Sequence, residues 1–375
     1  MGFSVIHILS ENSGKKTEFK IVDTSSMLAS KIMAGLQFSR VRTQFIALAI
    51  LLSLTLGFVG CGEDDNELTV YSSRTSSLVQ PLLEQYAADT GTNINVKYAS
   101  TASIVATLLE EGSNARPDVV YLADPAGWAL LSEEKFLSEL PDNLLNKVDK
   151  RFRSTEGEWV GLSGRSKVVV YNTETIDPNT DLPQSIMDFT DPKWKGRIGW
   201  APTHGEWQIT PMAIRIEKGE EAARSWLEGV KANQPRVYPN LISIVYAAGQ
   251  GEIDVGFVNH YYVPRFVKEE GPDFGARNHY LGKGDPGAVI DVAAVGIIKS
   301  TENQDTAERF VEYMLSSEAQ TYFAEQTHEY PLSAGVRPSG DLPPLDSLDP
   351  PDINPAELSQ LQATLKMLRD ADIIP

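Results

Sequence analysis

From Leu68 onward the sequence alternates short runs rich in β-branched residues with stretches of helical periodicity. The runs LTVYSS, INVKY and DVVYLA are separated by expected helices over 77–90 and 102–112. Such alternation is typical of parallel strands joined by crossover helices, so the sequence predicts an α/β fold. Further strands are expected over 168–172, 197–201, 255–259 and 292–298, and further helices over 220–233, 242–250 and 305–315.

The length of this α/β part predicts two lobes. A segment that runs from residue 62 to residue 375 is longer than one hydrophobic core usually holds, and two lobes leave a cleft between them. The proline-rich stretch 338–355 favours an extended segment on the surface. The pattern over 356–371 favours an amphipathic helix that closes the fold.

Residues 1–60 are typical of a lipoprotein export signal. Two arginines precede an apolar run from Phe45 to Leu56, and the sequence GFVGCG follows, with Cys61 the single cysteine of the chain. The apolar run is shorter than the ~20 residues that a bilayer-spanning helix needs, which disfavours an uncleaved anchor. We expect removal of residues 1–60, lipidation of Cys61 as the mature N-terminus, and a short acidic tether over 62–67.

Composition excludes several classes of function. The chain has 51 acidic and 33 basic residues and a formal net charge of -18, so binding to nucleic acid is not expected. A single cysteine excludes disulfide frameworks and metal sites built from several cysteines. Any metal chemistry must therefore use oxygen and nitrogen ligands.

The string Asn259-His260-Tyr261-Tyr262 is the most distinctive local pattern. It follows the apolar strand IDVGFV and precedes a helix that Pro264 opens. Ligands bind beyond the carboxyl ends of parallel strands, and a strand-to-helix turn allows both phenols to point at one place. Phenolate is a hard anionic oxygen ligand once a metal displaces its proton, and ferric ion suits such a pair best. The alternative is that both rings pack on a lobe surface.

Two further features favour an anion. Thr203-His204-Gly205 lies between an expected strand and a helix, where backbone N–H groups and the helix dipole attract negative charge. Arg165, in the SGRS turn, offers a guanidinium fork for a small oxyanion, and Arg74 is a second candidate. For either arginine the alternative is an ion pair between the lobes.

Enzymatic signatures are absent from the sequence. GLSGR lacks the second glycine of the nucleophile elbow G-x-S-x-G, and GKGD lacks the spacing of a nucleotide-binding P-loop. The histidines after residue 61 contain no i, i+4 pair of the zinc-protease type. We therefore expect a protein that is not an enzyme.

Several segments, in one order, resemble the periplasmic ferric-ion-binding proteins of bacterial iron ABC transporters. They are VYSSR, RPDVVYLAD, WVGLSGRSKVVVYNT, DPKWKGRIGWAPT, QGEIDVGFVNHYYV, KGDPGAVIDVAAVGII and EYPLSAGV. The resemblance runs from Leu68 to about Ala371. It implies a type II periplasmic binding fold, transferrin-like coordination of ferric ion with a synergistic anion, and delivery to a membrane permease.

The resemblance implies that Tyr261 and Tyr262 are ferric ligands. Two other usual ligand positions are not matched: the family's histidine after VYSSR is replaced by Thr-Ser-Ser, and its glutamate corresponds to Ala123. The anion, water or a substitute side chain would then complete the coordination. Among the substitutes we place Asp124 first, with Glu206 and His204 as the others.

The resemblance also indicates the anion site. It places at anion-contacting positions His204, Gly205, Glu206, Asn240 and Asn259. The carboxylate of Glu206 would repel a phosphate, which favours carbonate as the anion or a role for Glu206 itself as a ligand.

The family pattern also divides the chain. Lobe 1 is expected over 68–148, 154–167 and 291–340, and lobe 2 over 168–290 and 341–375. The chain would cross between the lobes near 148–168 and again near Asp291.

The expected protein is an exported, lipid-anchored monomer that captures ferric ion and passes it to an ABC permease and its ATPase. One alternative keeps the fold but binds a small organic anion or polyamine without metal, through Arg165, Asn240 and the tyrosine hydroxyls. A lipid-anchored hydrolase is a further alternative, supported only by the abundance of acidic residues.

Overall fold

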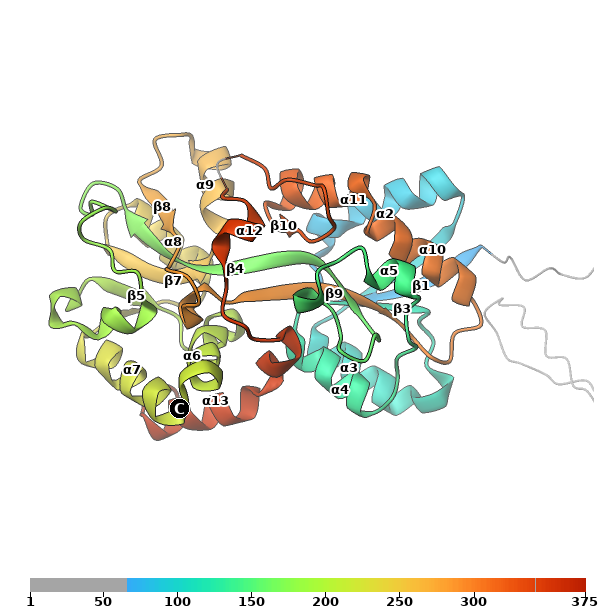
Figure 1. Cartoon of the computed structure of the whole chain (residues 1–375), viewed down its shortest axis with the longest axis horizontal. Coiled ribbons are helices and arrows are strands. Elements are labelled where there is room, and N and C mark those ends of the chain that lie inside the picture. Colours follow the sequence, from blue (N-terminus) through green and yellow to red (C-terminus); the bar gives the residue numbers. More distant parts are fainter. Residues whose placement is uncertain (1–65, 341) are drawn as a thin grey trace, which may run out of the picture. The chain divides into compact units, whose positions relative to one another are not determined.

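The strand β4 (Val160–Asn172) organises the fold, and the ribbon in Figure 1 shows it running through the middle of the folded part. The computed structural model describes residues 66–340 and 342–375. The export signal, the lipidation of Cys61 and most of the tether therefore lie outside the described residues. We expected a strand only over 168–172 and a turn at SGRS. The turn was wrong, because SGRS lies inside β4. The glycines of VGLSGR are poor indicators of a strand.

β4 changes its pairing partner at one point. Up to Ser166 it pairs antiparallel with β9 (Ile290–Ile297), and from Lys167 it pairs antiparallel with β7 (Val255–Asn259). β8 (Ala276–His279) and β10 (Tyr330–Pro331) also pair with β4. The step from Ser166 to Lys167 is thus where the sheet passes from one half of the molecule to the other.

The two halves contain the parallel strands that the sequence predicted. In the described part of the chain the sheet order is β2-β1-β3-β9-β4-β7-β5-β6. On one side β1 pairs in parallel with β2 and β3, and on the other β5 pairs in parallel with β6 and β7. The bounds of these strands are Glu67–Ser72 (β1), Asn93–Tyr98 (β2), Val119–Leu122 (β3), Ile198–Trp200 (β5) and Arg236–Val237 (β6). The prediction of an α/β fold is confirmed.

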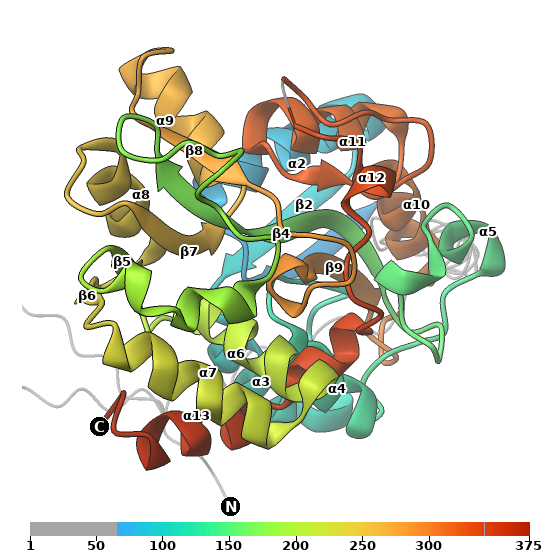
Figure 2. The same ribbon diagram turned by 60° about the vertical axis from the view of Figure 1, so that its left-hand side comes forward.

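Helices cover both halves of the sheet (Figures 1 and 2). The first half carries α2 (Ser76–Thr90), α3 (Thr101–Glu111), α4 (Pro125–Glu133), α5 (Asp142–Leu145), α10 (Gln304–Met314) and α11 (Ser317–Tyr322). The second carries α6 (Gly205–Lys218), α7 (Glu220–Ala232), α8 (Leu241–Gly249) and α9 (Tyr262–Glu270). In α7 the buried residues Ala223, Trp226, Leu227 and Val230 recur with the helical period, which gives this helix one apolar face.

Apolar side chains form two large core clusters, one in each half. β4 contributes Val160 and Leu162 to the first cluster and Val168, Val169 and Val170 to the second. Two separate cores on either side of one continuous strand are what a two-lobed arrangement requires, with β4 as the connecting strand.

The C-terminal segment contributes side chains to both core clusters. We placed 341–375 entirely in lobe 2, but Leu348, at the end of α12 (Leu345–Leu348), is buried in the first core cluster. Met367 and Leu368, in α13 (Leu361–Asp370), are buried in the second. Isolated leucines among prolines do not indicate which core they join, and the assignment of 341–375 to lobe 2 stays a prediction. α13 packs against α6, and it begins later than the expected helix because a 3₁₀ turn (Pro355–Ser359) precedes it.

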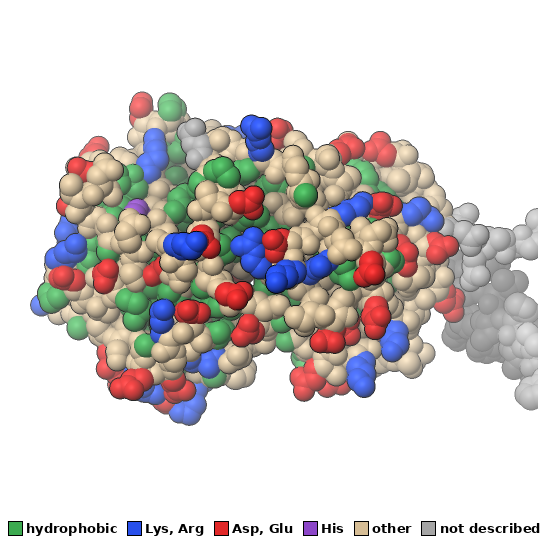
Figure 3. Space-filling view, in the orientation of Figure 1, with side chains coloured by type: hydrophobic (Ala, Val, Ile, Leu, Met, Phe, Trp, Pro, Cys, Tyr) green, Lys and Arg blue, Asp and Glu red, His purple; other side chains and the backbone are tan. Residues whose placement is uncertain are grey.

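The surface is mainly acidic, as the net charge requires. On the face shown in Figure 3, carboxylates are spread widely, and Lys and Arg side chains gather near the middle among carboxylates. This face presents no continuous basic surface. None of the helices within 66–340 and 342–375 is both long enough and apolar enough to cross a membrane.

Candidate functional site

Tyr261 and Tyr262 lie at the turn between β7 and α9. Their ring centroids are 4.4 Å apart, with an angle of 46° between the ring planes. Tyr261 is buried and Tyr262 is partly buried. The guanidinium of Arg265 lies over the Tyr261 ring, 4.4 Å from its centroid. The strand-to-helix turn thus brings the two phenol rings together, as the sequence suggested, although the helix begins at Tyr262 rather than at Pro264.

His260 fixes this turn to the neighbouring strand. Its backbone N–H donates to the carbonyl of Ser166 at 3.0 Å, and its Nδ1 accepts from the backbone N–H of Ser166 at 3.1 Å. Its ring packs on Tyr330, with centroids 4.6 Å apart. Complete burial lowers the pKa of His260 to about 3, so the ring is neutral at physiological pH. His260 therefore holds the turn in place and does not face the phenols as a charged group.

The phenol groups are protonated when no metal is present. Burial raises the pKa of Tyr261 well above its ordinary value, and the neighbouring Tyr262 and Glu206 raise it further. Burial also raises the pKa of Tyr262. A cation bound by both oxygens would have to displace both protons, which a trivalent ion does more readily than a divalent one.

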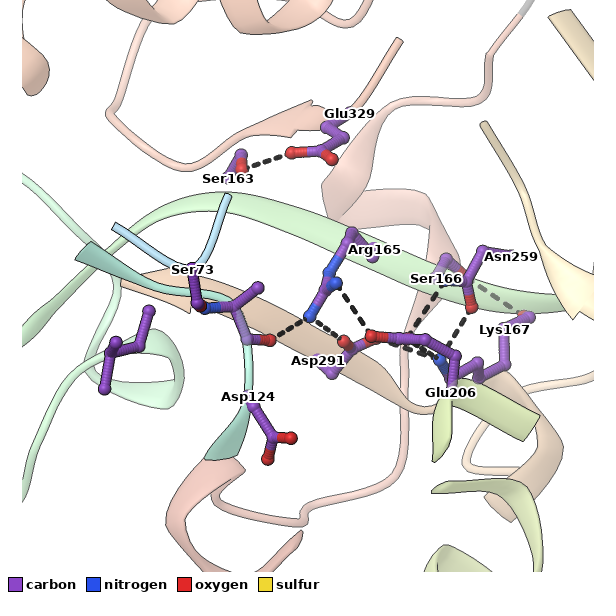
Figure 4. Close-up of polar contacts among 12 residues, drawn as sticks. Ser73, Asp124, Ser163, Arg165, Ser166, Lys167, Glu206, Asn259, Asp291 and Glu329 are labelled. Atoms are coloured by element: carbon purple, nitrogen blue, oxygen red, sulfur yellow. Dashed lines mark hydrogen bonds and ion pairs between the residues drawn. The ribbon is translucent and has the colours of Figure 1, made fainter. Parts of the chain in front are cut away.

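The side chains of Arg165, Lys167, Glu206 and Asp291 form a closed network (Figure 4). Arg165 Nη1 lies 2.9 Å from Glu206 Oε1, and Lys167 Nζ lies 2.9 Å from Glu206 Oε2. Both cations also pair with Asp291, Lys167 at 3.3 Å. Arg165 Nη2 donates in addition to the backbone carbonyl of Ala123. The network thus joins two basic and two acidic side chains, and burial, with Glu206 nearby, raises the pKa of Asp291 although Arg165 and Lys167 oppose the rise.

Asn259 joins the network to the tyrosines. Its Nδ2 donates to Glu206 Oε2 at 3.1 Å and to the Tyr261 hydroxyl at 3.2 Å, and its Oδ1 accepts from Lys167 Nζ at 2.6 Å. Burial alone would raise the pKa of Glu206, but Arg165 and Lys167 lower it well below its usual range. Glu206 is therefore ionised. The structure brings four of the predicted site residues together: Arg165, Glu206, Asn259 and Tyr261.

A cavity of about 240 Å³ adjoins Glu206. Asp124, His204 and Gly205 line it as well, so the N-termini of α4 and α6 both reach its wall. Asp124 is exposed, and its Oδ1 accepts from the backbone N–H of Ala126 at 2.9 Å, which caps α4. In Figure 4 Asp124 lies apart from the charge network. Burial lowers the pKa of His204, so this ring is neutral.

Asn240 and Thr203, two of the residues expected to contact the anion, do not join the charge network in this structure. The side chain of Asn240 caps α8 by accepting from the backbone N–H of Ser243 at 2.9 Å. Thr203 is exposed in the loop before α6. Asn240 and Thr203 therefore stay predictions as anion-contacting residues.

The two candidate arginines for an external anion are held by carboxylates of the protein. Both Nη groups of Arg165 are engaged by Glu206, Asp291 and the Ala123 carbonyl. Arg74 pairs with Glu329 at 2.6 Å, and Glu329 also accepts from the hydroxyl of Ser163. Arg74 and Glu329 both fall in ranges expected for lobe 1, whereas Arg165 and Glu206 fall in ranges expected for different lobes.

Sequence reasoning missed Lys167 and Asp291. Each is a charged residue inside a buried strand, in SGRSKVVV and AVIDVAAV. A buried charge needs a partner of opposite sign, so these positions carried a signal of a paired cluster. Within 66–340 and 342–375 no group of three or more His, Cys, Asp or Glu is arranged to hold a metal. A metal centre at this site therefore depends on the phenolic oxygens.

The α/β fold, with two core clusters joined by β4, is that of a solute-binding protein, and comparison with known proteins agrees. Residues 82–344 match the family model of bacterial extracellular solute-binding proteins. The major ferric iron-binding protein of Neisseria meningitidis is 32% identical over 308 residues, which cover 81% of this chain and 92% of that protein.

Two solved structures show the same fold. Iron-bound HitA from Pseudomonas aeruginosa has a TM-score of 0.74 and 32% identity, covering 81% of this chain and 99% of that chain. A Trichodesmium protein (IdiA, FutA) in complex with iron and citrate has a TM-score of 0.73 and 25% identity, covering 82% of this chain and 100% of that chain. The chain belongs to the ferric-ion-binding proteins among the bacterial extracellular solute-binding proteins, with the type II periplasmic binding fold.

Proposed function

We propose that this protein captures ferric ion between the phenolate oxygens of Tyr261 and Tyr262. The observation that carries the proposal is the position of the two rings, 4.4 Å apart at the carboxyl end of β7. The similar proteins from Neisseria meningitidis and Pseudomonas aeruginosa are named for ferric iron and solved with iron, respectively, which supports the same cargo here.

Two phenolates leave coordination positions of the ferric ion open. A synergistic anion completes the sphere, either a small external one such as carbonate or phosphate, or a carboxylate of the chain. Glu206 and Asp124 both line the adjoining cavity, as do His204 and Gly205, which were expected to contact the anion. The Trichodesmium protein was solved with iron and citrate together, which supports a carboxylate near iron in this fold.

The protein acts outside the cytoplasm and catalyses no reaction. Its family is extracellular, and the segment ending at Cys61 supports export followed by lipid attachment. In this proposal the monomer closes its two lobes on the metal and passes it to an ABC permease and its ATPase. β4 forms the hinge, because it contributes side chains to both core clusters.

The alternative of a metal-free organic anion or polyamine has less support. An organic anion would need a free cationic group, whereas Arg165 and Lys167 are each paired with two carboxylates.

The test is iron analysis combined with the visible spectrum. Exposure to ferric citrate should load about one ferric ion per chain and produce a phenolate-to-iron charge-transfer band. The double variant Tyr261→Phe/Tyr262→Phe should lose both the band and the iron. Tyr246→Phe, which changes an exposed tyrosine of α8, is the matched control and should retain both. A colourless wild-type protein without bound iron would refute the proposal.

A further inference from the structure

The carboxylate of Glu206 is surrounded by donors of the kind that hold a small anion in proteins. Three side-chain donors point at it: Arg165 Nη1 and Lys167 Nζ, each at 2.9 Å, and Asn259 Nδ2 at 3.1 Å. Glu206 also lies in the first turn of α6, where the helix N-terminus favours negative charge. Two cations, an amide and a helix N-terminus are the donors that a small oxyanion uses in proteins.

An external anion would have to displace Glu206. Arg165 Nη2 and Lys167 Nζ are further engaged by Asp291, which is fully buried, so the two cations are already matched by two carboxylates. Adding carbonate or phosphate beside Glu206 would place negative charges next to each other, because Arg165 and Lys167 are already engaged by Glu206 and Asp291. The network as built therefore disfavours a second anion.

Glu206 is also coupled to the tyrosine pair. The Nδ2 group of Asn259 contacts both Glu206 Oε2, at 3.1 Å, and the Tyr261 hydroxyl, at 3.2 Å. One amide thus separates the carboxylate from the expected metal ligand. A ferric ion on two phenolates keeps one positive charge, which attracts a carboxylate held close to it.

We propose that Glu206 is the built-in counter-anion of the ferric centre, so that this chain binds ferric ion without external carbonate or phosphate. The inference rests on the proposed function, since it presumes ferric ion on Tyr261 and Tyr262. Arg165, Lys167 and Asn259 then act as positioning residues that hold the carboxylate toward the metal.

The test compares ferric loading with and without added anion. Ferrous chloride is added to the purified protein and oxidised in air, in buffer freed of carbonate and phosphate, and the charge-transfer band is titrated. The titration is repeated with sodium bicarbonate and with sodium phosphate. For the wild-type protein the apparent iron affinity should change by less than about threefold when either anion is added. An anion that bound directly to the iron would be expected to change this affinity by about tenfold or more.

Variants at position 206 should create a need for an external anion. Glu206→Ala should weaken loading in anion-free buffer by about 10–100-fold, as is usual for groups that support metal ligands. Bicarbonate or phosphate should restore much of the loss, because the donors of Arg165, Lys167 and Asn259 are then free. Glu206→Gln should lose a similar amount of iron affinity in anion-free buffer. It should regain less on adding bicarbonate or phosphate, because the glutamine side chain still fills the space that the anion would enter. Glu217→Ala, an exposed acid of the same helix, is the control and should match the wild-type protein.

Either of two results would overturn the inference: a wild-type protein that loads only when anion is added, or a folded Glu206→Ala protein that loads as the wild type does in anion-free buffer. The wild-type comparison decides the question even if the alanine variant does not fold. If the wild-type protein binds no iron in any of the buffers, the proposed function fails, and the inference fails with it.

Discussion

Lys167 and Asn259 are register partners across β4 and β7, and the Lys167 ammonium donates to the Asn259 side-chain oxygen at 2.6 Å. The pair lies where β4 leaves β9 and begins to pair with β7. The same ammonium faces Glu206 and Asp291. The point at which the two halves join is therefore also the point at which the candidate site is held together.

Replacing Lys167 with methionine should strongly destabilise the fold. Lys167 is buried, and its removal leaves Glu206 and Asp291 with one cation, so the free energy of unfolding should fall by about 3–5 kcal/mol. Urea denaturation followed by tryptophan fluorescence measures the change. Lys195→Met, at an exposed position, serves as the control and should change stability by less than about 0.5 kcal/mol. A loss below about 1 kcal/mol for Lys167→Met would show that the network does not depend on this charge.

Breaking the Arg74–Glu329 pair should lower the free energy of unfolding about as much as Lys167→Met does. Glu329→Gln leaves the buried guanidinium of Arg74 without its carboxylate, and we expect a loss of about 3–5 kcal/mol in unfolding free energy. The double variant Arg74→Met/Glu329→Gln should recover a large part of that loss, because no buried charge is then unpaired. If the double variant is no more stable than Glu329→Gln, the pairing argument does not hold.

The lowered pKa of the Glu329 carboxylate predicts that the stability of the fold depends on pH. Burial raises the pKa of Glu329, but Arg74 and Arg165 lower it more, so its pKa in the folded protein lies below the ordinary value of 4.5. The unfolded chain then binds a proton that the folded protein does not, and the stabilisation is lost as pH falls below about 4.5. Unfolding free energy measured from pH 6 to pH 3 should fall less steeply in Glu329→Gln than in the wild-type protein. Parallel curves would count against a lowered pKa.

Ferric binding should release protons and weaken in acid. Burial raises the pKa of both phenols, so Tyr261 and Tyr262 are protonated before the metal arrives, and each must lose its proton on binding. Iron affinity should therefore rise with pH and fall as pH is lowered. Calorimetric titrations in buffers of different ionisation enthalpy count the released protons, and about two per ferric ion are expected from the phenols. Binding without proton release would exclude the phenols as ligands.

Much of the architecture and the centre of the site could be predicted from the sequence. The alternation of strand and helix patterns indicated the α/β fold, and the position of Tyr261 and Tyr262 after the IDVGFV strand indicated that they would meet. Both signals are local, because they depend on residues that are close in the chain.

The rest depends on contacts between distant segments. The sequence did not show that Lys167 and Asp291 would face each other, or that Glu206 from α6 would lie between Arg165 and Lys167. Nor did it show that Leu348 would join the first core, because any exposed apolar surface of suitable shape can receive a leucine. Strand pairing and ion pairing across such separations follow from the assembled fold and not from local pattern.

The resonance Raman spectrum of the ferric-loaded protein, excited within its visible band, tests most directly whether the two phenols bind the metal. Tyrosinate ring vibrations should be enhanced in the wild-type protein and in Tyr246→Phe, reduced in Tyr261→Phe and in Tyr262→Phe, and absent from the double variant. A ferric-loaded wild-type protein whose spectrum shows no tyrosinate vibrations would contradict coordination by Tyr261 and Tyr262.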